Sequence, residues 1–156
     1  MFPYPLAGRK FRQDRLFLLA LLAGPLSWGI HYLLLQPEPQ WVWPLVAPLA
    51  YLLPVVVYPV LEEIVFRGLL QELVHDYISP RCFGPLSVAN LLTSLLFTAM
   101  HFFYHAPLWA ALVFLPSLVF GFFKDRTGRL TAPILLHSFY NAGFLLLFTC
   151  LLYTSP

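Results

Sequence analysis

Two adjacent carboxylates and an arginine interrupt an almost continuously apolar stretch in the middle of the chain, at residues 61–68. Holding a charge at hydrocarbon depth costs free energy, so such residues face a protein interior or a wet cavity and are candidates for function. In a helix, Glu63 and Arg67 lie four apart on one face, in the better orientation for an ion pair. Glu62 lies about 100° away around the helix axis, without that partner. The spacing therefore predicts one neutralised acid, Glu63, and one acid that is free to act chemically, Glu62.

Polar side chains in two other apolar segments bear on the simplest alternative, in which the Glu pair only marks a solvated helix end at a membrane surface. His101 lies in one segment, and His137 and Asn141 lie in another. A lone histidine is usually a satisfied core residue, and polar side chains also hold transmembrane helices together. His137 and Asn141, however, are four apart on one helical face and project into the same space. Polar residues on three separate segments favour one shared site.

A metal site is an open alternative for these side chains. His105 follows His101 by four residues, and such a histidine pair together with a glutamate is a plausible set of ligands for a divalent metal. A zinc site would draw its ligands from His101, His105 and His137. Cys82 and Cys150 lie far apart, with no CxxC motif and no metal-ligand spacing, so we expect both to be unpaired and structural.

The composition is typical of a membrane protein. Of 156 residues, 60% are hydrophobic, 17% aromatic and 10% charged, and the mean hydropathy is +0.76. Soluble domains are roughly 45–50% apolar and 25% charged, and this length fits one domain. The formal charge is only +2, and basic residues crowd the N-terminus, which is an orientation signal and not a nucleic-acid footprint. We therefore expect a lipid bilayer, and no nucleic acid, around this chain.

The apolar segments predict an all-α, polytopic fold with about five transmembrane helices, because a hydrocarbon core about 30 Å thick needs about 20 residues. The expected spans are 16–35, 41–60, 86–104, 108–123 and 131–152. Four prolines in the second span predict a kinked, partly unwound helix, which is tolerated at membrane depth only where protein or a cavity covers it. The Glu pair then begins an additional interfacial or re-entrant motif helix that runs to about Tyr77.

Basic residues alternate between successive loops. Four lie in the N-terminal tail and three in the loop 124–129, whereas the loops 36–40 and 105–106 contain none. The positive-inside rule then places the N-terminus in the cytoplasm and the C-terminus outside. The expected organisation is a cytoplasmic basic tail at 1–15, a single transmembrane domain at 16–152 and a short C-terminal tail at 153–156.

Counting along these spans creates one conflict. Glu62 falls near the cytoplasmic end of the second span, whereas His101 falls some fifteen residues along the third, about 22 Å deep at 1.5 Å per residue. The two side chains meet only if the motif helix is re-entrant or steeply tilted, which the preceding prolines permit.

Three motifs in order carry a resemblance to a known family. They are Glu62-Glu63-x-x-x-Arg67, Phe97-x-x-x-His101 and His137-x-x-x-Asn141. Together they resemble the signature of the CAAX protease and bacteriocin-processing family of intramembrane endopeptidases, and residues 127–137 resemble the lead-in to its last motif. The similarity covers roughly residues 60–144. It implies an all-helical protease domain at 16–152 in the inner (plasma) membrane, acting on a membrane-anchored protein or peptide.

The resemblance also implies a role for each motif residue. Glu62 would activate a water with help from His101, and His137 with Asn141 would stabilise the oxyanion of the tetrahedral intermediate. Glu63 and Arg67 would support the site by fixing the motif helix. This glutamate-type mechanism needs no cofactor. The chemistry is reasonable in itself, since a carboxylate in a poorly solvated cavity is a stronger base than in water, and preorganised donors at an oxyanion contribute several kcal/mol.

Two alternatives stand beside this interpretation. One is a zinc-dependent intramembrane protease that uses the histidines named above. The other is a non-catalytic membrane protein for binding or immunity, which keeps the polar site to recognise a partner. The completeness of all three motifs favours catalysis.

Overall fold

The structure is a computed structural model that describes residues 13–39, 41–79 and 81–153, with side chains as far as Phe148. Most of the expected basic tail, residues 1–12, and residues 154–156 of the expected C-terminal tail lie outside the described part. The side chain of Cys150 also lies outside it. Cys82 is a free cysteine.

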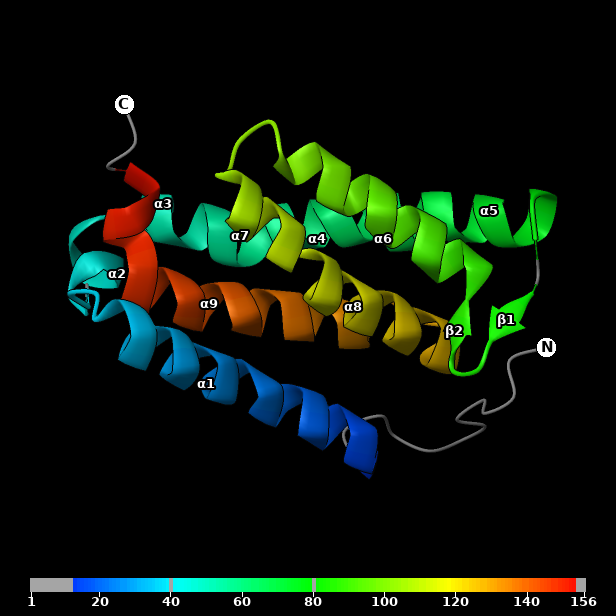
Figure 1. Cartoon of the computed structure of the whole chain (residues 1–156), viewed down its shortest axis with the longest axis horizontal. Helices are drawn as coiled ribbons and strands as arrows, with labels where there is room; N and C mark the ends of the chain where they lie inside the picture. The colour runs from blue at the N-terminus through cyan, green and yellow to red at the C-terminus, as the bar shows by residue number, and fades with distance from the viewer. Residues whose placement is uncertain (1–12, 40, 80, 154–156) are drawn as a thin grey trace.

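The described chain is almost entirely helical (Figure 1). The helices are α1 (Arg15–Leu35), α2 (Trp43–Val46), α3 (Pro48–Leu52), α4 (Tyr58–Glu63), α5 (Gln71–Tyr77), α6 (Val88–His101), α7 (Pro107–Leu112), α8 (Phe114–Thr127) and α9 (Thr131–Tyr153), and the strands are β1 (Cys82–Phe83) and β2 (Leu86–Ser87). Four helical stretches are long and apolar enough to cross a membrane, namely Arg15–Leu35, Pro48–Tyr77, Pro107–Thr127 and Thr131–Phe148. α6 is a shorter apolar helix of 14 residues. The expected all-α, polytopic membrane fold is confirmed.

One continuous helical stretch, Pro48–Tyr77, carries the Glu pair at its middle, and we call this whole stretch the motif helix. The sequence predicted a separate motif helix after a span broken by prolines, but the chain does not leave the helix. Two π-helical segments, Leu53–Val57 and Ile64–Leu70, connect α3, α4 and α5. A π turn contains one more residue than an α turn, so the wider turn accommodates Pro54 and Pro59, which have no N–H to donate.

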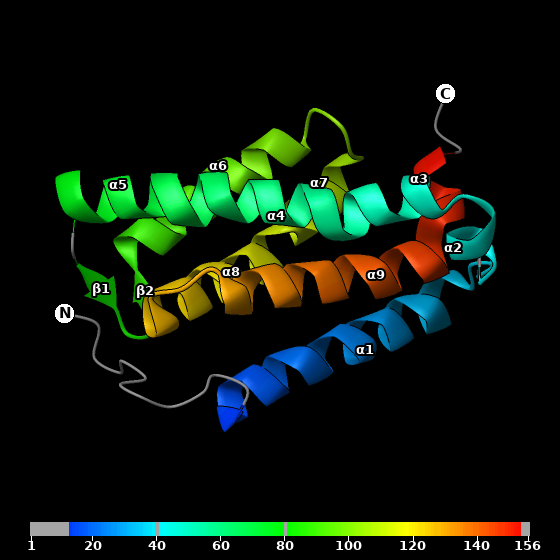
Figure 2. The same cartoon turned by 180° about the vertical axis from the view of Figure 1, so that it is seen from behind.

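A short β-hairpin leads from α5 into α6. β1 pairs antiparallel with β2, and Gly84 takes a φ of 59° that glycine adopts without strain. α5 and α6 lie side by side and run in opposite directions (Figures 1 and 2). Glu62 precedes the end of α5 by about 22 Å of helix, and His101 follows the start of α6 by about 20 Å. The two residues are therefore at similar heights, which removes the conflict raised by counting along the sequence.

The interior is as polar as it is apolar. Among the described residues, eleven buried side chains are hydrophobic and eleven are polar or charged. Large apolar side chains instead cover the outside, and along α1 only Phe17 and Gly24 are buried. This distribution fits a lipid-facing exterior with polar contacts between helices.

α1 lies along α9 at one edge of the bundle (Figures 1 and 2). Asp14 caps α1 by accepting from the N–H of Leu16, 3.1 Å away, and its other oxygen lies 2.6 Å from Nε of Arg126 at the end of α8. Trp28 packs against Gly143 of α9, where an added Cβ would come within 2.3 Å of the indole. These contacts fix α1 on the bundle although most of its surface is exposed.

Candidate active site

Glu63 and Arg67 form the buried ion pair that their spacing predicts. Arg67 Nε lies 3.4 Å from Glu63 Oε2, and neither side chain has exposed surface. Arg67 is held from α8 as well, because its Nη2 donates to the carbonyl oxygen of Ser117 at 2.9 Å and to its Oγ at 2.6 Å. Its guanidinium lies over the ring of Phe97, 5.4 Å from the centroid. The arginine is thus fixed on three sides.

His137 of α9 contacts both acids of the motif helix. Its Nδ1 lies 2.9 Å from Glu63 Oε1, and its ring stacks on Phe120 with centroids 4.8 Å apart and planes 18° from parallel. A carboxylate that is paired with Arg67 accepts hydrogen bonds, so Nδ1 carries the proton. Nε2 then points toward Glu62, whose Oε2 is 3.6 Å away. That distance is too long for a direct hydrogen bond, so both groups are free to act on a molecule beside them.

Glu62 is the accessible acid of the pair. Its side chain is 35% exposed, whereas that of Glu63 is 0% exposed. Glu63 uses one oxygen for Arg67 and the other for His137. Of the two acids, Glu62 is therefore the one that can reach a water or a substrate.

His101, at the end of α6, joins this cluster through an aromatic ring. Phe97 contacts both imidazoles, with ring centroids 4.5 Å from His101 and 5.9 Å from His137. Nδ1 of His101 lies 2.8 Å from the carbonyl oxygen of Phe97, which leaves Nε2 as an acceptor in the neutral ring. Within the described residues, His101 makes no hydrogen bond or ion pair with Glu62. The structure thus brings the two to one region without direct contact.

Asn141 lies one helical turn beyond His137 and binds the backbone of the motif helix. Its Nδ2 donates to the carbonyl oxygen of Pro54 at 2.9 Å. That carbonyl lacks its usual helical donors. The N–H of Tyr58, four residues on, bonds to the carbonyl oxygen of Leu53 instead, and Pro59, five residues on, has no N–H. Asn141 therefore satisfies a carbonyl that the first π-helical segment leaves open. One N–H of the amide remains for another acceptor.

A family model described as Type II CAAX prenyl endopeptidase Rce1-like matches residues 41–143. The matched segment is about two thirds of the chain and contains all three motifs. The chain belongs to this family. No curated protein and no solved structure matches the Rce1-like chain significantly. Membership makes it, at the level of the family, a CAAX-type intramembrane protease that resides in a lipid bilayer.

The histidines of the zinc alternative do not converge in the Rce1-like chain. His101 and His105 stack with centroids 5.5 Å apart and planes 20° from parallel, so the rings face each other and do not aim their nitrogens at one point. Among the described residues, no three His, Cys, Asp or Glu side chains are grouped closely enough to hold a metal ion.

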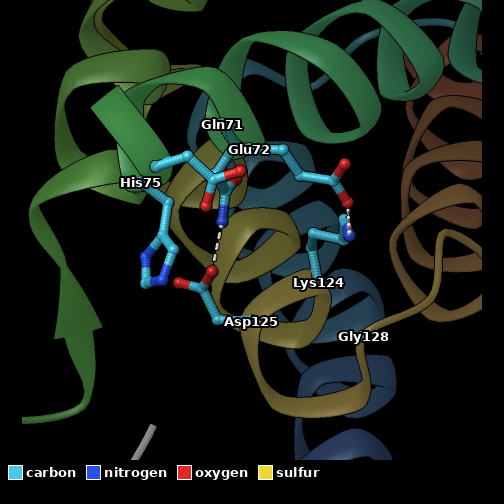
Figure 3. A pocket seen from close by; sticks show the side chains of 7 residues that line it. Gln71, Glu72, His75, Lys124, Asp125 and Gly128 are labelled. Atoms are coloured by element: carbon cyan, nitrogen blue, oxygen red, sulfur yellow. Dashed lines mark hydrogen bonds and ion pairs between the residues drawn. The ribbon is translucent and has the colours of Figure 1, made fainter. Parts of the chain in front are cut away.

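A second polar cluster lies farther along the motif helix of the Rce1-like chain, at a pocket of about 330 Å³ (Figure 3). The pocket is lined by Gln71, Glu72, His75, Asp76, Lys124, Asp125 and Gly128. Gln71 Nε2 donates to Asp125 Oδ1 at 2.7 Å, and Lys124 Nζ lies 2.5 Å from Glu72 Oε1. Gln71 follows Glu63 by eight residues, about 12 Å along the helix. The pocket is therefore separate from the Glu62 site.

Sequence reasoning missed two contacts at the site. The bond between Glu63 and His137 joins residues 74 apart, and the bonds from Arg67 to Ser117 join residues 50 apart. The one available signal for the second was a serine in the apolar first part of this helix, spaced four residues before Gly121 and eight before Asp125.

Proposed function

We propose that this Rce1-like protease hydrolyses a peptide bond of a membrane-associated protein or peptide, with Glu62 as the base that activates water. The observation that supports it most is the division between the two acids. Glu63 is buried and holds Arg67 and His137, whereas Glu62 beside it is accessible. The proposed machinery consists of Glu62, His101, His137 and Asn141, supported by Glu63 and Arg67.

Charge balance sets the proposed starting state. Arg67 neutralises Glu63, and a net charge left at a dry site is costly. Glu62 and His137 therefore hold one further proton between them, in addition to the proton on His137 Nδ1. With that proton on His137, Glu62 is a carboxylate and the imidazolium carries N–H groups at both nitrogens.

Hydrolysis then proceeds through proton transfers at Glu62. Glu62 takes a proton from water while the oxygen attacks the scissile carbonyl carbon, and His101 Nε2 helps to orient that water. His137 Nε2–H and the second N–H of Asn141 donate to the oxyanion. Glu62 then gives its proton to the departing amine as the C–N bond breaks. The new carboxylic acid loses its remaining proton to water, Glu62 ends as a carboxylate, and no covalent bond forms between enzyme and substrate.

The proposal is tested by reconstituting the purified protein with a library of membrane-anchored peptides and identifying products by mass spectrometry. Cleavage at a defined position near the membrane supports it. Specific binding of peptides without any cleavage would instead favour the non-catalytic alternative.

We expect His105→Ala to keep most of the activity, because the contact that the described structure gives the His105 side chain at the site is stacking on His101. His101→Ala should lower the rate by about 10²–10⁴, the usual contribution of a group that assists proton transfer. Cleavage rates are compared before and after prolonged chelation, together with elemental analysis. Stoichiometric zinc, and activity that is lost on chelation and restored by metal, would contradict the glutamate-type mechanism and favour the zinc alternative.

We also propose that the protein lies in the inner (plasma) membrane with its N-terminus in the cytoplasm and with one protease domain at 16–152 between short tails. Cys82, in the hairpin between α5 and α6, would then face the cytoplasm. In a Cys150→Ser variant, an impermeant maleimide should label Cys82 only after the cells are permeabilised. Labelling in intact cells would reverse the orientation.

A further inference from the structure

Three positions on one side of α8 face the motif helix and bind it. They are Ser117, Gly121 and Asp125, spaced four residues apart, and we call them the α8 rail. Arg67 bonds to Ser117, and Gln71 Nε2 donates to the carbonyl of Gly121 at 3.0 Å and to Asp125. Figure 3 shows the last of these bonds.

The motif helix keeps its polar residues on one line because of its second π-helical segment. In a regular α-helix, side chains four apart drift by about 40° around the axis, so Glu63 and Gln71 would lie about 80° apart. The wider turns of Ile64–Leu70 reduce this drift. Glu63, Arg67 and Gln71 are all buried, with at most 1% exposed surface. The π-helical segment therefore lets two successive turns bind the same neighbour.

The rail is itself held at a fixed place by α6. Gly121 lies so close to Asn90 that an added Cβ would come 1.9 Å from Asn90 Oδ1, and Asn90 Nδ2 donates to the carbonyl of Leu118 at 2.9 Å. Ser87 Oγ, at the start of α6, donates to Asp125 Oδ2 at 2.7 Å. α6 thus fixes the rail at two heights.

A chain of contacts leads from the rail to the imidazole at the proposed site. Ser117 receives both hydrogen bonds of Arg67 Nη2, while Nη1 and Nε have no hydrogen-bond partner in the described part of the chain. Arg67 Nε faces Glu63 Oε2 at 3.4 Å, and Glu63 Oε1 holds His137 Nδ1. Ser117 therefore supplies both hydrogen bonds that direct the guanidinium from α8, and its hydroxyl makes the shorter of the two.

We propose that Ser117 is a positioning residue for catalysis, which fixes the orientation of His137 and the hydrogen bond of its Nδ1–H through Arg67 and Glu63. The inference rests on the proposed function, in which His137 Nε2 faces the substrate. In the described part of the chain, no hydrogen bond joins Ser117 to Glu62 or His137. Its hydroxyl keeps Arg67 directed at Glu63, so that Glu63 has one oxygen available for Nδ1–H.

The test uses two buried serines. Ser117 and Ser94 are both 0% exposed, but the Oγ of Ser94 donates to Asn90 within α6 and not to the motif helix. Full-length wild type, Ser117→Ala and Ser94→Ala are labelled with ¹⁵N-histidine and placed in lipid nanodiscs, and their ¹⁵N NMR spectra are recorded. The signals of His137 are those that disappear in His137→Gln. Wild type and Ser94→Ala should show a protonated Nδ1 at His137. In Ser117→Ala the Nδ1 signal of His137 should be shifted and broadened, because its hydrogen bond to Glu63 is no longer held in one geometry.

If the wild type cleaves a peptide, the cleavage of that peptide is also measured with Ser117→Ala and Ser94→Ala. Ser117→Ala should lower kcat by about 10- to 100-fold, as small misplacements of catalytic groups do, with little change in KM, and Ser94→Ala should stay close to wild type. Unchanged His137 signals in Ser117→Ala would overturn the inference, and so would equal losses in both variants. If the wild type cleaves no peptide, the proposed function fails, while the ¹⁵N signals still decide whether Ser117 positions His137.

Discussion

Glu62→Gln should abolish peptide-bond cleavage and leave the fold intact. The amide has nearly the shape of the carboxylate but cannot accept the proton of water, and general-base catalysis contributes about 10²–10⁴ in rate. Because 35% of this side chain is exposed, the free energy of unfolding should change by no more than about 0.5 kcal/mol, as for ordinary surface substitutions. Both quantities are measured on the same preparation, by product formation in liposomes and by thermal unfolding in detergent.

A matched control lies on the same helix. Glu72→Gln removes a carboxylate that is 58% exposed and paired with Lys124 at the separate pocket, so cleavage should persist. Retained cleavage by Glu62→Gln, or a large loss of stability in that variant, would remove Glu62 from the role of base.

Glu63→Gln should have the largest effect on stability. Glu63 neutralises Arg67 and accepts from His137 at a fully buried position. Removing one partner of a buried ion pair leaves the other charge uncompensated, which costs about 3–5 kcal/mol. Activity should fall as well, since the amide of Gln has one oxygen in place of two and cannot accept from both Arg67 and His137 Nδ1. The unfolding midpoint and the yield of purified protein measure the first effect.

A double variant separates the stranded charge from other causes. Glu63→Gln/Arg67→Met removes both charges, so part of the lost stability should return, because replacing a whole buried pair is far less costly than breaking it. Activity should not return. If Glu63→Gln were no less stable than Glu62→Gln, the buried pair would not hold the site together.

The local part of the site follows from the sequence. Residues four apart share one helical face whatever surrounds them, so Arg67 meets Glu63 as expected. The continuous apolar segments likewise predict membrane helices, because the length of a span is set by the bilayer.

What could not be predicted depends on residues far apart in the chain. Prolines read one at a time predict an end to the second span, yet the π-helical segments carry the helix through to Tyr77. That continuation depends on Asn141, which satisfies the carbonyl of Pro54 from 87 residues away. Since the continuous helix also sets the height of Glu62, the sequence alone misplaced Glu62 relative to His101.

The partner of His137 was also beyond local reasoning. The resemblance gave this residue the role of oxyanion donor, but the spacing of the motifs contains nothing that brings it to Glu63 Oε1. Ser117 lies in the apolar first part of α8, and only the packing of α8 against the motif helix gives its hydroxyl a partner.

The most direct test of water activation by Glu62 is a single-turnover cleavage of a membrane-anchored peptide in H₂¹⁸O by the reconstituted wild-type protein. Product and enzyme are then both analysed by mass spectrometry. If Glu62 is the base, one ¹⁸O enters the new C-terminal carboxylate of the product in the first turnover, and the peptide containing Glu62 stays unlabelled. Incorporation of ¹⁸O into Glu62 with an unlabelled product would show that Glu62 attacks the carbonyl itself, and would contradict the account.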